Sequence, residues 1–397
     1  MGEPWRNWSG SIASHPRRIA CPRDAEEVAV LLREAAARGG VVRAVGAGHS
    51  SSEIVGCDDT LVSLRHFTGI AEADPNAGEA VVGAGSTLAE LGAQLYERDL
   101  ALPNYGDVAT QTIGGAVGTG THGSGRLQPN LSGMLVGVTL VDGNGELRTI
   151  TRERVDELLA ARVALGTLGV FLWMRLALVP SFDVSRREYA IATDAALAQL
   201  PDLVEGNRSF DFYWYPRRDD AKLRLVNPVG GGTTPRDARL VTRTDGYGHV
   251  VIPTHTNIPH RFEESEYALP AEAGVACFQA VRARVKERWR HIAGWRVLYR
   301  TIRADDAFLS PAHGRDTVTI SLHQNRTLPW REYFDELEPV FLAHGGRPHW
   351  AKKHNQRAAT LAPRYPRWDD FARVRAAFDP RGVLLTPYLR ELLGVAA

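Results

Sequence analysis

The pattern of apolar and polar positions predicts a helix, a strand and a loop near the start of the chain. Apolar residues recur with helical spacing over 25–38, and Gly39 and Gly40 follow as a helix stop. Residues 40–45 then form a short apolar run typical of a strand. It leads directly into 46–52, which is mostly glycine and serine with one histidine. The pattern therefore predicts a helix–strand–loop unit with a polar loop.

The rest of the chain divides near Pro180, where the composition changes. Before it, we predict strands at 60–64, 79–84 and 171–174, helices at 88–98 and 155–165, and a hairpin at 134–150 around the turn 142–145. After it, we predict sheet at 210–215 and 317–323, helices at 194–206, 271–290 and 330–344, and a mobile surface loop at 229–235. The predicted fold class is α+β with two domains.

Length, charge and cysteine content narrow the class of protein. A chain of 397 residues is long enough for two domains, and 47 Lys and Arg against 46 Asp and Glu give no basic field for nucleic acid. Three widely separated cysteines, Cys21, Cys57 and Cys277, predict reduced thiols rather than disulfides or a metal site. The start lacks an apolar signal core, and no apolar run approaches the roughly 20 residues of a membrane helix. We expect a cytoplasmic protein with no metal.

Three glycine-rich runs, 46–52, 104–125 and 163–170, lie within the first 180 residues. Glycine lets the backbone come close to a ligand, and the N–H groups and hydroxyls that follow it suit a pyrophosphate. The first run is not a P-loop, because no Gly-Lys-Ser/Thr ends it. Taken alone, it could be a glycine-rich turn with an incidental His49. The three runs together predict one long cofactor clamp.

Six motifs give the chain a specific resemblance to a known family. They are Val45-Gly46-Ala47-Gly48-His49-Ser50, residues 118–125, 165–170 and 304–311, Pro348-His349-Trp350-Ala351-Lys352, and Asp379-Pro380-Arg381-Gly382. With these motifs the chain resembles the flavin-dependent aldonolactone and alditol oxidoreductases of the vanillyl-alcohol oxidase superfamily over nearly its whole length. The resemblance implies a PCMH-type FAD-binding domain over 1–180, an α+β substrate (cap) domain over 181–375, and a segment, 376–397, that returns to the FAD domain.

The resemblance also implies bound FAD, covalently attached through its 8α-methyl carbon to His49. The residues that it places around the cofactor are Gly46, Gly48, Ser50 and Ser51 at the pyrophosphate, Gly114, Gly115, Gly118, Thr119, Thr121, His122, Gly123 and Ser124 along the isoalloxazine and diphosphate, and Gly169 and Val170 at the adenosine. His122 could instead only brace its loop.

Three further residues match the family's substrate side. Lys352 resembles the lysine near the substrate and the flavin, where a cation stabilises charge developing on the reduced ring. Arg300 resembles the arginine of a Glu-x-Arg pair that faces the substrate, but Leu298 stands at the glutamate position, which removes a carboxylate able to bind a polyol hydroxyl. His323, on a predicted strand, is a candidate polar contact or base, or an ordinary strand histidine.

The predicted activity is oxidation of an alcohol group on a small polyhydroxy substrate, foremost an aldono-1,4-lactone of the gulonolactone type. The resemblance implies hydride transfer to flavin N5 and reoxidation by O2 to give H2O2, because Gly106 lies where an alanine can obstruct oxygen in related enzymes. Gly106 could also serve only a turn. The alternatives are an alditol or sugar oxidase, a dehydrogenase that uses a quinone or cytochrome acceptor, and a sugar-binding protein without redox activity.

Overall fold

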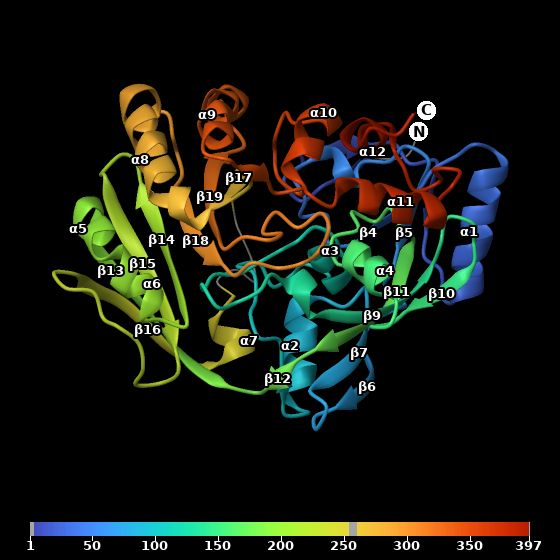
Figure 1. Ribbon diagram of the computed structural model, residues 1–397, viewed down its shortest axis with the longest axis horizontal. Helices are drawn as coiled ribbons and strands as arrows, with labels where there is room; N and C mark the ends of the chain where they lie inside the picture. The colour runs from blue at the N-terminus through green and yellow to red at the C-terminus, as the bar shows by residue number, and fades with distance from the viewer. Residues whose placement is uncertain (1–3, 254–259, 397) are drawn as a thin grey trace.

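The computed structural model describes residues 4–253 and 260–396. Residues 1–3, 254–259 and 397, which belong to the predicted domains 1–180, 181–375 and 376–397, lie outside it. Figure 1 shows two lobes side by side, with both ends of the chain on the first lobe. Most of the first half of the chain and the C-terminal helices form the first lobe. A large sheet covered by helices forms the second lobe.

The first lobe contains the predicted helix–strand–loop unit. Helix α1 (Ala25–Ala37) begins at Asp24, whose side chain accepts a hydrogen bond from the backbone N–H of Glu27. Strand β4 (Val42–Val45) pairs in parallel with β5 (Thr60–Ser63), which also pairs with β3 (Arg18–Ala20). The loop that follows β4 leaves this sheet at the inter-lobe side, where it lines a cavity. The prediction for this unit is confirmed.

A second, antiparallel sheet completes the first lobe. Its strands, in spatial order, are β10 (Leu147–Ile150), β9 (Leu135–Val141), β11 (Val170–Ala177), β7 (Glu79–Gly83) and β6 (Ile70–Asp74). β9 and β10 form the predicted hairpin, and helices α2 (Leu88–Tyr96) and α4 (Val155–Ala161) lie at the predicted positions. A short helix, α3 (Ile113–Gly118), occupies the middle of the second glycine-rich run.

The second lobe is built on one eight-stranded sheet. In spatial order the strands are β16 (Arg239–Tyr247), β13 (Asp183–Ala192), β15 (Asp220–Asn227), β14 (Ser209–Tyr215), β18 (Val297–Ile302), β19 (Thr317–Asn325), β17 (Phe262–Pro270) and β20 (Arg347–Pro348). Alternate residues of these strands, such as Val297, Ile320 and Tyr267, pack in one apolar cluster with the covering helices. The intervening residues of β17, β18 and β19 face the first lobe.

The covering helices differ in detail from the predicted ones. The predicted helix 194–206 is two helices, α5 (Thr193–Ala198) and α6 (Leu200–Glu205). Pro201 in the first turn of α6 explains the break, because proline lacks an N–H and disfavours helix in the residue before it. The predicted helix 271–290 is a 3₁₀ turn, then α8 (Gly274–Arg284), then a π-helical turn. Helix α9 (Arg331–Ala343) matches its prediction.

The last helices pack on the first lobe. Core residues of α10 (Ala358–Leu361), α11 (Trp368–Phe378) and α12 (Pro387–Leu393) belong to the same apolar cluster as α2 and β9. The Val42 backbone N–H also donates to the carbonyl of Val383 at 2.9 Å. This packing favours a return to the first lobe that begins before the predicted residue 376; the domain boundaries stay predictions.

Candidate active site

A cavity of about 420 Å³ is lined by residues of both lobes. This volume is in the range of sites that hold cofactors and drug-sized ligands. Most of the predicted site residues line it: Gly46, Gly48, His49, Ser50, Gly106, Gly114, Gly115, Gly118, Thr119, Thr121, His122, Gly169, Arg300, His323 and Lys352. The three glycine-rich runs and the three substrate-side residues therefore meet in one place.

Four predicted residues lie outside this lining: Ser51, Gly123, Ser124 and Val170. The Ser51 hydroxyl is directed at the carbonyls of Ala351 and Glu264, and the Ser124 hydroxyl donates to the carbonyl of Phe210. Gly123 packs against Asn104, and Val170 belongs to the core beneath α1. Their contacts tie the loops to the framework behind the cavity.

Glycines keep the first-lobe side of the cavity open. A Cβ added at Gly118 would meet no atom within 4 Å, and one at Gly115 would meet only Thr112 Oγ1 at 3.3 Å. Side chains at these positions would project into the cavity and fill it. At Gly46 the reason is different, because an added Cβ would lie 2.0 Å from Thr112 Oγ1. A cradle of bare backbone with hydroxyls beside it fits a large planar cofactor with a diphosphate.

His49 lies at the mouth of the first glycine loop with its ring held from two sides. Its Nε2 is 3.0 Å from Thr110 Oγ1, and its ring stacks on Trp8 with the centroids 4.9 Å apart. Burial and the positive charges of Lys352 and Arg261 lower the pKa of His49 to about 4. The imidazole is therefore neutral near pH 7, which is the state in which a ring nitrogen is a nucleophile.

The second-lobe side of the cavity is a polar patch on three adjacent strands, β18, β19 and β17. Side chains that point to one face of these strands bring Arg300, His323 and Glu264 into the lining, together with the loop residue Lys352. Lys352 Nζ donates to Glu264 Oε2, and His323 Nε2 lies 3.3 Å from Glu264 Oε1. Burial acts to raise the pKa of Glu264, but Lys352 and His323 hold it below the usual range.

A second buried carboxylate, Glu266, lies two residues further along β17. Its Oε2 accepts from Arg300 Nη2 at 2.6 Å and from the Ser321 hydroxyl, and its Oε1 is 2.7 Å from His122 Nε2. Burial acts to raise the pKa of Glu266, but His122 and Arg300 hold it well below the usual range. His122 also places Nδ1 2.9 Å from the carbonyl of Gly123, so both of its ring nitrogens face acceptors.

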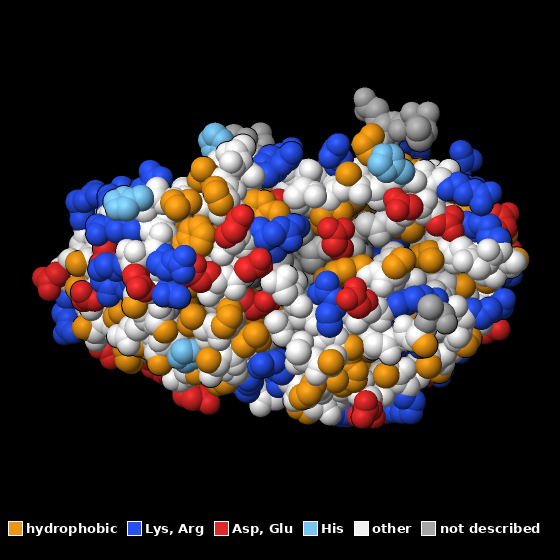
Figure 2. All heavy atoms as spheres, turned by 90° about the horizontal axis from the view of Figure 1, so that it is seen from above, with side chains coloured by type: hydrophobic (Ala, Val, Ile, Leu, Met, Phe, Trp, Pro, Cys, Tyr) orange, Lys and Arg blue, Asp and Glu red, His pale blue; other side chains and the backbone are white. Residues whose placement is uncertain are grey.

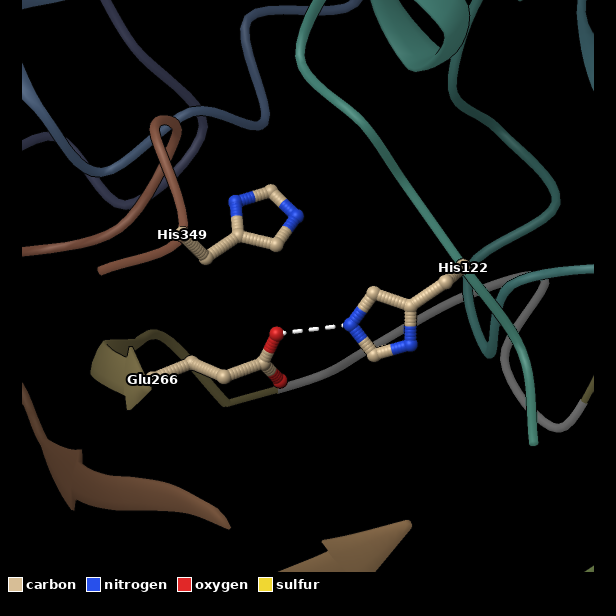
Figure 3. A group of neighbouring side chains, drawn as sticks. All are labelled: His122, Glu266 and His349. Atoms are coloured by element: carbon tan, nitrogen blue, oxygen red, sulfur yellow. Dashed lines mark hydrogen bonds and ion pairs between the residues drawn. The ribbon is translucent and has the colours of Figure 1, made fainter. Parts of the chain in front are cut away.

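Figure 3 shows the side chains of His122, His349 and Glu266 grouped together, with the bond from His122 to the Glu266 carboxylate dashed. One ligand atom from each of the three side chains lies within 4.8 Å of the others, which is close enough to surround a metal ion. Sequence reasoning found no metal-ligand spacing and missed this group, because its members come from three distant segments.

The sequence also missed Glu264 and Glu266. Neither was singled out because the run 262–270 was not predicted as a strand. The signal was present: two glutamates at positions i and i+2 precede a short apolar stretch, which puts both on one face of a strand. His349 was quoted within a motif but given no role.

Two family models match the chain in the regions that form the two sides of the cavity. "FAD binding domain" matches residues 16–151, and "D-arabinono-1,4-lactone oxidase" matches residues 248–392. The glycine cradle and the first match define the class: the protein is an FAD-dependent oxidoreductase with a two-domain α+β fold.

Similar proteins match almost end to end. The L-gulono-1,4-lactone dehydrogenase of Mycobacterium tuberculosis is 36% identical, covering 99% of this chain and 100% of that one. The Streptomyces alditol oxidase is 31% identical and the Mus musculus L-gulonolactone oxidase 27%, each covering 98% of both chains. The chain belongs to this family of aldonolactone and alditol oxidoreductases, within the PCMH-type FAD superfamily. A cholesterol oxidase from Brevibacterium sterolicum shares the fold, with a TM-score of 0.84 at 16% identity over 98% of this chain and 96% of that one.

Two observations bear on the expected absence of a basic field for nucleic acid and of a membrane helix. On the face shown in Figure 2, positive and negative side chains are interspersed, with no broad field of one sign. Within the part of the chain that the structure describes, no helix has the length and apolar character needed to cross a membrane.

Proposed function

We propose that the protein oxidises an alcohol group of an aldono-1,4-lactone of the L-gulono-1,4-lactone type, with O2 as electron acceptor and H2O2 as product. The observation that supports this most is the continuity of one cavity, from the glycine cradle to the polar patch of Lys352, Arg300 and Glu264. Bound FAD would supply the redox chemistry, as the acceptor of the hydride from the substrate's carbinol carbon. The protein side chains bind, orient and carry charge.

Each residue of the polar patch has a role in this proposal. Lys352 is the cation that would stabilise the negative charge developing on the flavin ring as it is reduced. Arg300 orients substrate hydroxyls and holds Glu266 in place. His323 places Nδ1 3.2 Å from the carbonyl of Arg296 and Nε2 3.3 Å from Glu264 Oε1, so its role is that of a polar contact beside the Glu264 carboxylate.

A substrate panel tests the proposal against its nearest alternative, since the Streptomyces relative is an alditol oxidase. Initial rates with aldonolactones, alditols and free sugars would be compared at equal concentration with an artificial electron acceptor. We expect the highest kcat/KM with a 1,4-lactone. A highest value with an alditol would reassign the substrate class while leaving the flavin chemistry intact.

We further propose that FAD is attached covalently to His49 through its 8α-methyl carbon. The neutral ring, its hydrogen bond to Thr110 and its place in the glycine loop support this assignment. We predict that the denatured wild-type protein retains the mass of one FAD and that His49→Ala releases flavin on denaturation. Intact-protein mass spectrometry measures both. Flavin lost from the denatured wild type would contradict the linkage.

A dehydrogenase is the second candidate, because the relative at 36% identity is named a dehydrogenase; its acceptor would be a quinone or cytochrome. Gly106 lines the cavity, and a Cβ added there would lie 3.0 Å from Thr121 Cγ2. We predict that Gly106→Ala slows reoxidation by air and leaves reduction by substrate largely unchanged. Air-mixing of anaerobically reduced protein measures this. Wild-type protein that stays reduced in air for many minutes would favour the dehydrogenase.

We propose a reducing compartment such as the cytoplasm as the site of action. Cys21, Cys57 and Cys277 are all free thiols.

A further inference from the structure

Leu298, Ser321 and Glu266 form one row of register partners across three adjacent strands of the second-lobe sheet. Leu298 on β18 is the register partner of Ser321 on β19, and Ser321 is the register partner of Glu266 on β17. Side chains of a row point to the same face of a sheet, and both Leu298 and Glu266 line the cavity. Because Ser321 is small, the longer Glu266 side chain extends over it and accepts its hydrogen bond.

The carboxylate of Glu266 is fixed but not saturated. An ionised carboxylate offers about four acceptor positions on its two oxygens. Oε2 accepts from Arg300 and Ser321, and Oε1 accepts from His122. Among the described residues, one acceptor position of Oε1 therefore has no hydrogen-bond donor. Glu266 is only 1% exposed, and its three donors hold the carboxylate in one position at the cavity wall.

The donors around Glu266 argue against a metal ion at this place. Arg300 already provides a positive charge at Oε2, at 2.6 Å. The backbone N–H of Ala351 donates to Nδ1 of His349 at 3.1 Å, and burial lowers the pKa of His349 to about 3. The neutral ring therefore carries its hydrogen on Nε2 and has no lone pair left for a cation. The free acceptor position on Glu266 Oε1 therefore suits a hydrogen-bond donor rather than a cation.

We propose that Glu266 is a substrate-binding residue whose Oε1 accepts a hydrogen bond from one hydroxyl group of the substrate. Leu298, in the same row, contacts the carbon skeleton beside that hydroxyl. A polyhydroxy compound supplies such a donor, whereas a ligand group without a hydrogen would leave the carboxylate unsatisfied. This inference rests on the proposed function and adds a specific contact to it.

The test uses Glu266→Gln in the holoenzyme with a series of monodeoxy aldonolactones, each lacking one hydroxyl. Glutamine keeps the side chain's size but loses the charge. Glu263→Gln is the matched control, because Glu263 is also buried on β17 but faces away from the cavity, toward Lys353. We expect Glu266→Gln to lower kcat/KM on the order of 10-fold to 10²-fold, the cost of a hydrogen bond to a charged group, with flavin content unchanged. Glu263→Gln should leave kcat/KM as in the wild type.

The deoxy series separates contact with the substrate from a structural role. If Glu266 binds one hydroxyl, the lactone that lacks it should lose little further kcat/KM in Glu266→Gln, although it loses much in the wild type. Equal losses for every deoxy lactone in both proteins would overturn the proposal. Wild-type flavin that no lactone and no alditol reduces would instead contradict the proposed function itself, before any variant is compared.

Discussion

Replacing Lys352 by alanine is expected to slow reduction of the bound flavin on the order of 10²-fold. Lys352 lines the cavity and is held by Glu264, so its ammonium is positioned before the reaction begins. A preorganised cation is worth most where negative charge develops in a site that excludes water. Rapid anaerobic mixing of the variant with substrate, followed through the visible flavin absorbance, measures the rate constant directly.

The adjacent lysine offers a matched control. Lys353 lies 3.6 Å from Glu263 and over the Trp330 ring, and it does not line the cavity. Lys353→Ala should therefore reduce its flavin at nearly the wild-type rate. A Lys352→Ala protein with a wild-type rate of flavin reduction would mean that the active centre lies elsewhere.

Replacing Arg300 by alanine is expected to impair both substrate turnover and stability. Removing one partner of a buried ion pair leaves an uncompensated charge and typically costs about 3–5 kcal/mol. We expect a loss of about 3 kcal/mol in the free energy of unfolding, the low end of that range, because His122 and Ser321 still bind Glu266. Denaturant unfolding measures the loss, and kcat/KM with the preferred lactone measures the effect on turnover.

The pH dependence of this loss identifies its cause. The folded-state pKa of Glu266 lies well below its usual value, so its ion pairs stabilise the fold above the unfolded pKa. That contribution is lost as the pH falls through the folded pKa. The difference between wild type and Arg300→Ala should therefore narrow below about pH 4, near the unfolded pKa of glutamate. Arg303→Ala, at an exposed position near the end of the same strand, should change stability by no more than about 0.5 kcal/mol. A difference independent of pH would contradict the role of Glu266.

In the first lobe, local sequence patterns were sufficient to predict helix α1 and the hairpin of β9 and β10. Helix α1 has a capping aspartate, helical spacing and two glycines directly after its last turn, and the hairpin of β9 and β10 is defined by its turn. The glycine-rich runs could be assigned to a ligand because bare backbone lets a ligand approach closely, but the many glycines of the second run do not prevent a helix, since α3 forms there. Sequence alone could not show which residues of these runs line the cavity. Ser124 does not line it, because its hydroxyl donates to the carbonyl of Phe210.

Long-range pairing accounts for what the sequence could not reveal. Glu266 meets His122 across 144 positions and Arg300 across 34, and nothing in the local pattern encodes either distance. The sequence showed that Leu298 replaces the family's glutamate, but it did not show that Glu266 lies in the same cross-strand row. That row forms only because β19 lies between β18 and β17. The spatial strand order departs from the order along the chain at this point, which local patterns cannot predict.

One cavity that joins a bound flavin to a site for a polyhydroxy lactone is the feature on which the proposed function depends. Anaerobic titration of the purified protein with L-gulono-1,4-lactone tests it most directly, with the visible absorption of the oxidised flavin as the readout. We predict a yellow protein whose visible band disappears as lactone is added, reaching completion at saturating substrate. A protein that is colourless, or whose band is unchanged by aldonolactones at saturation, would contradict the proposed function.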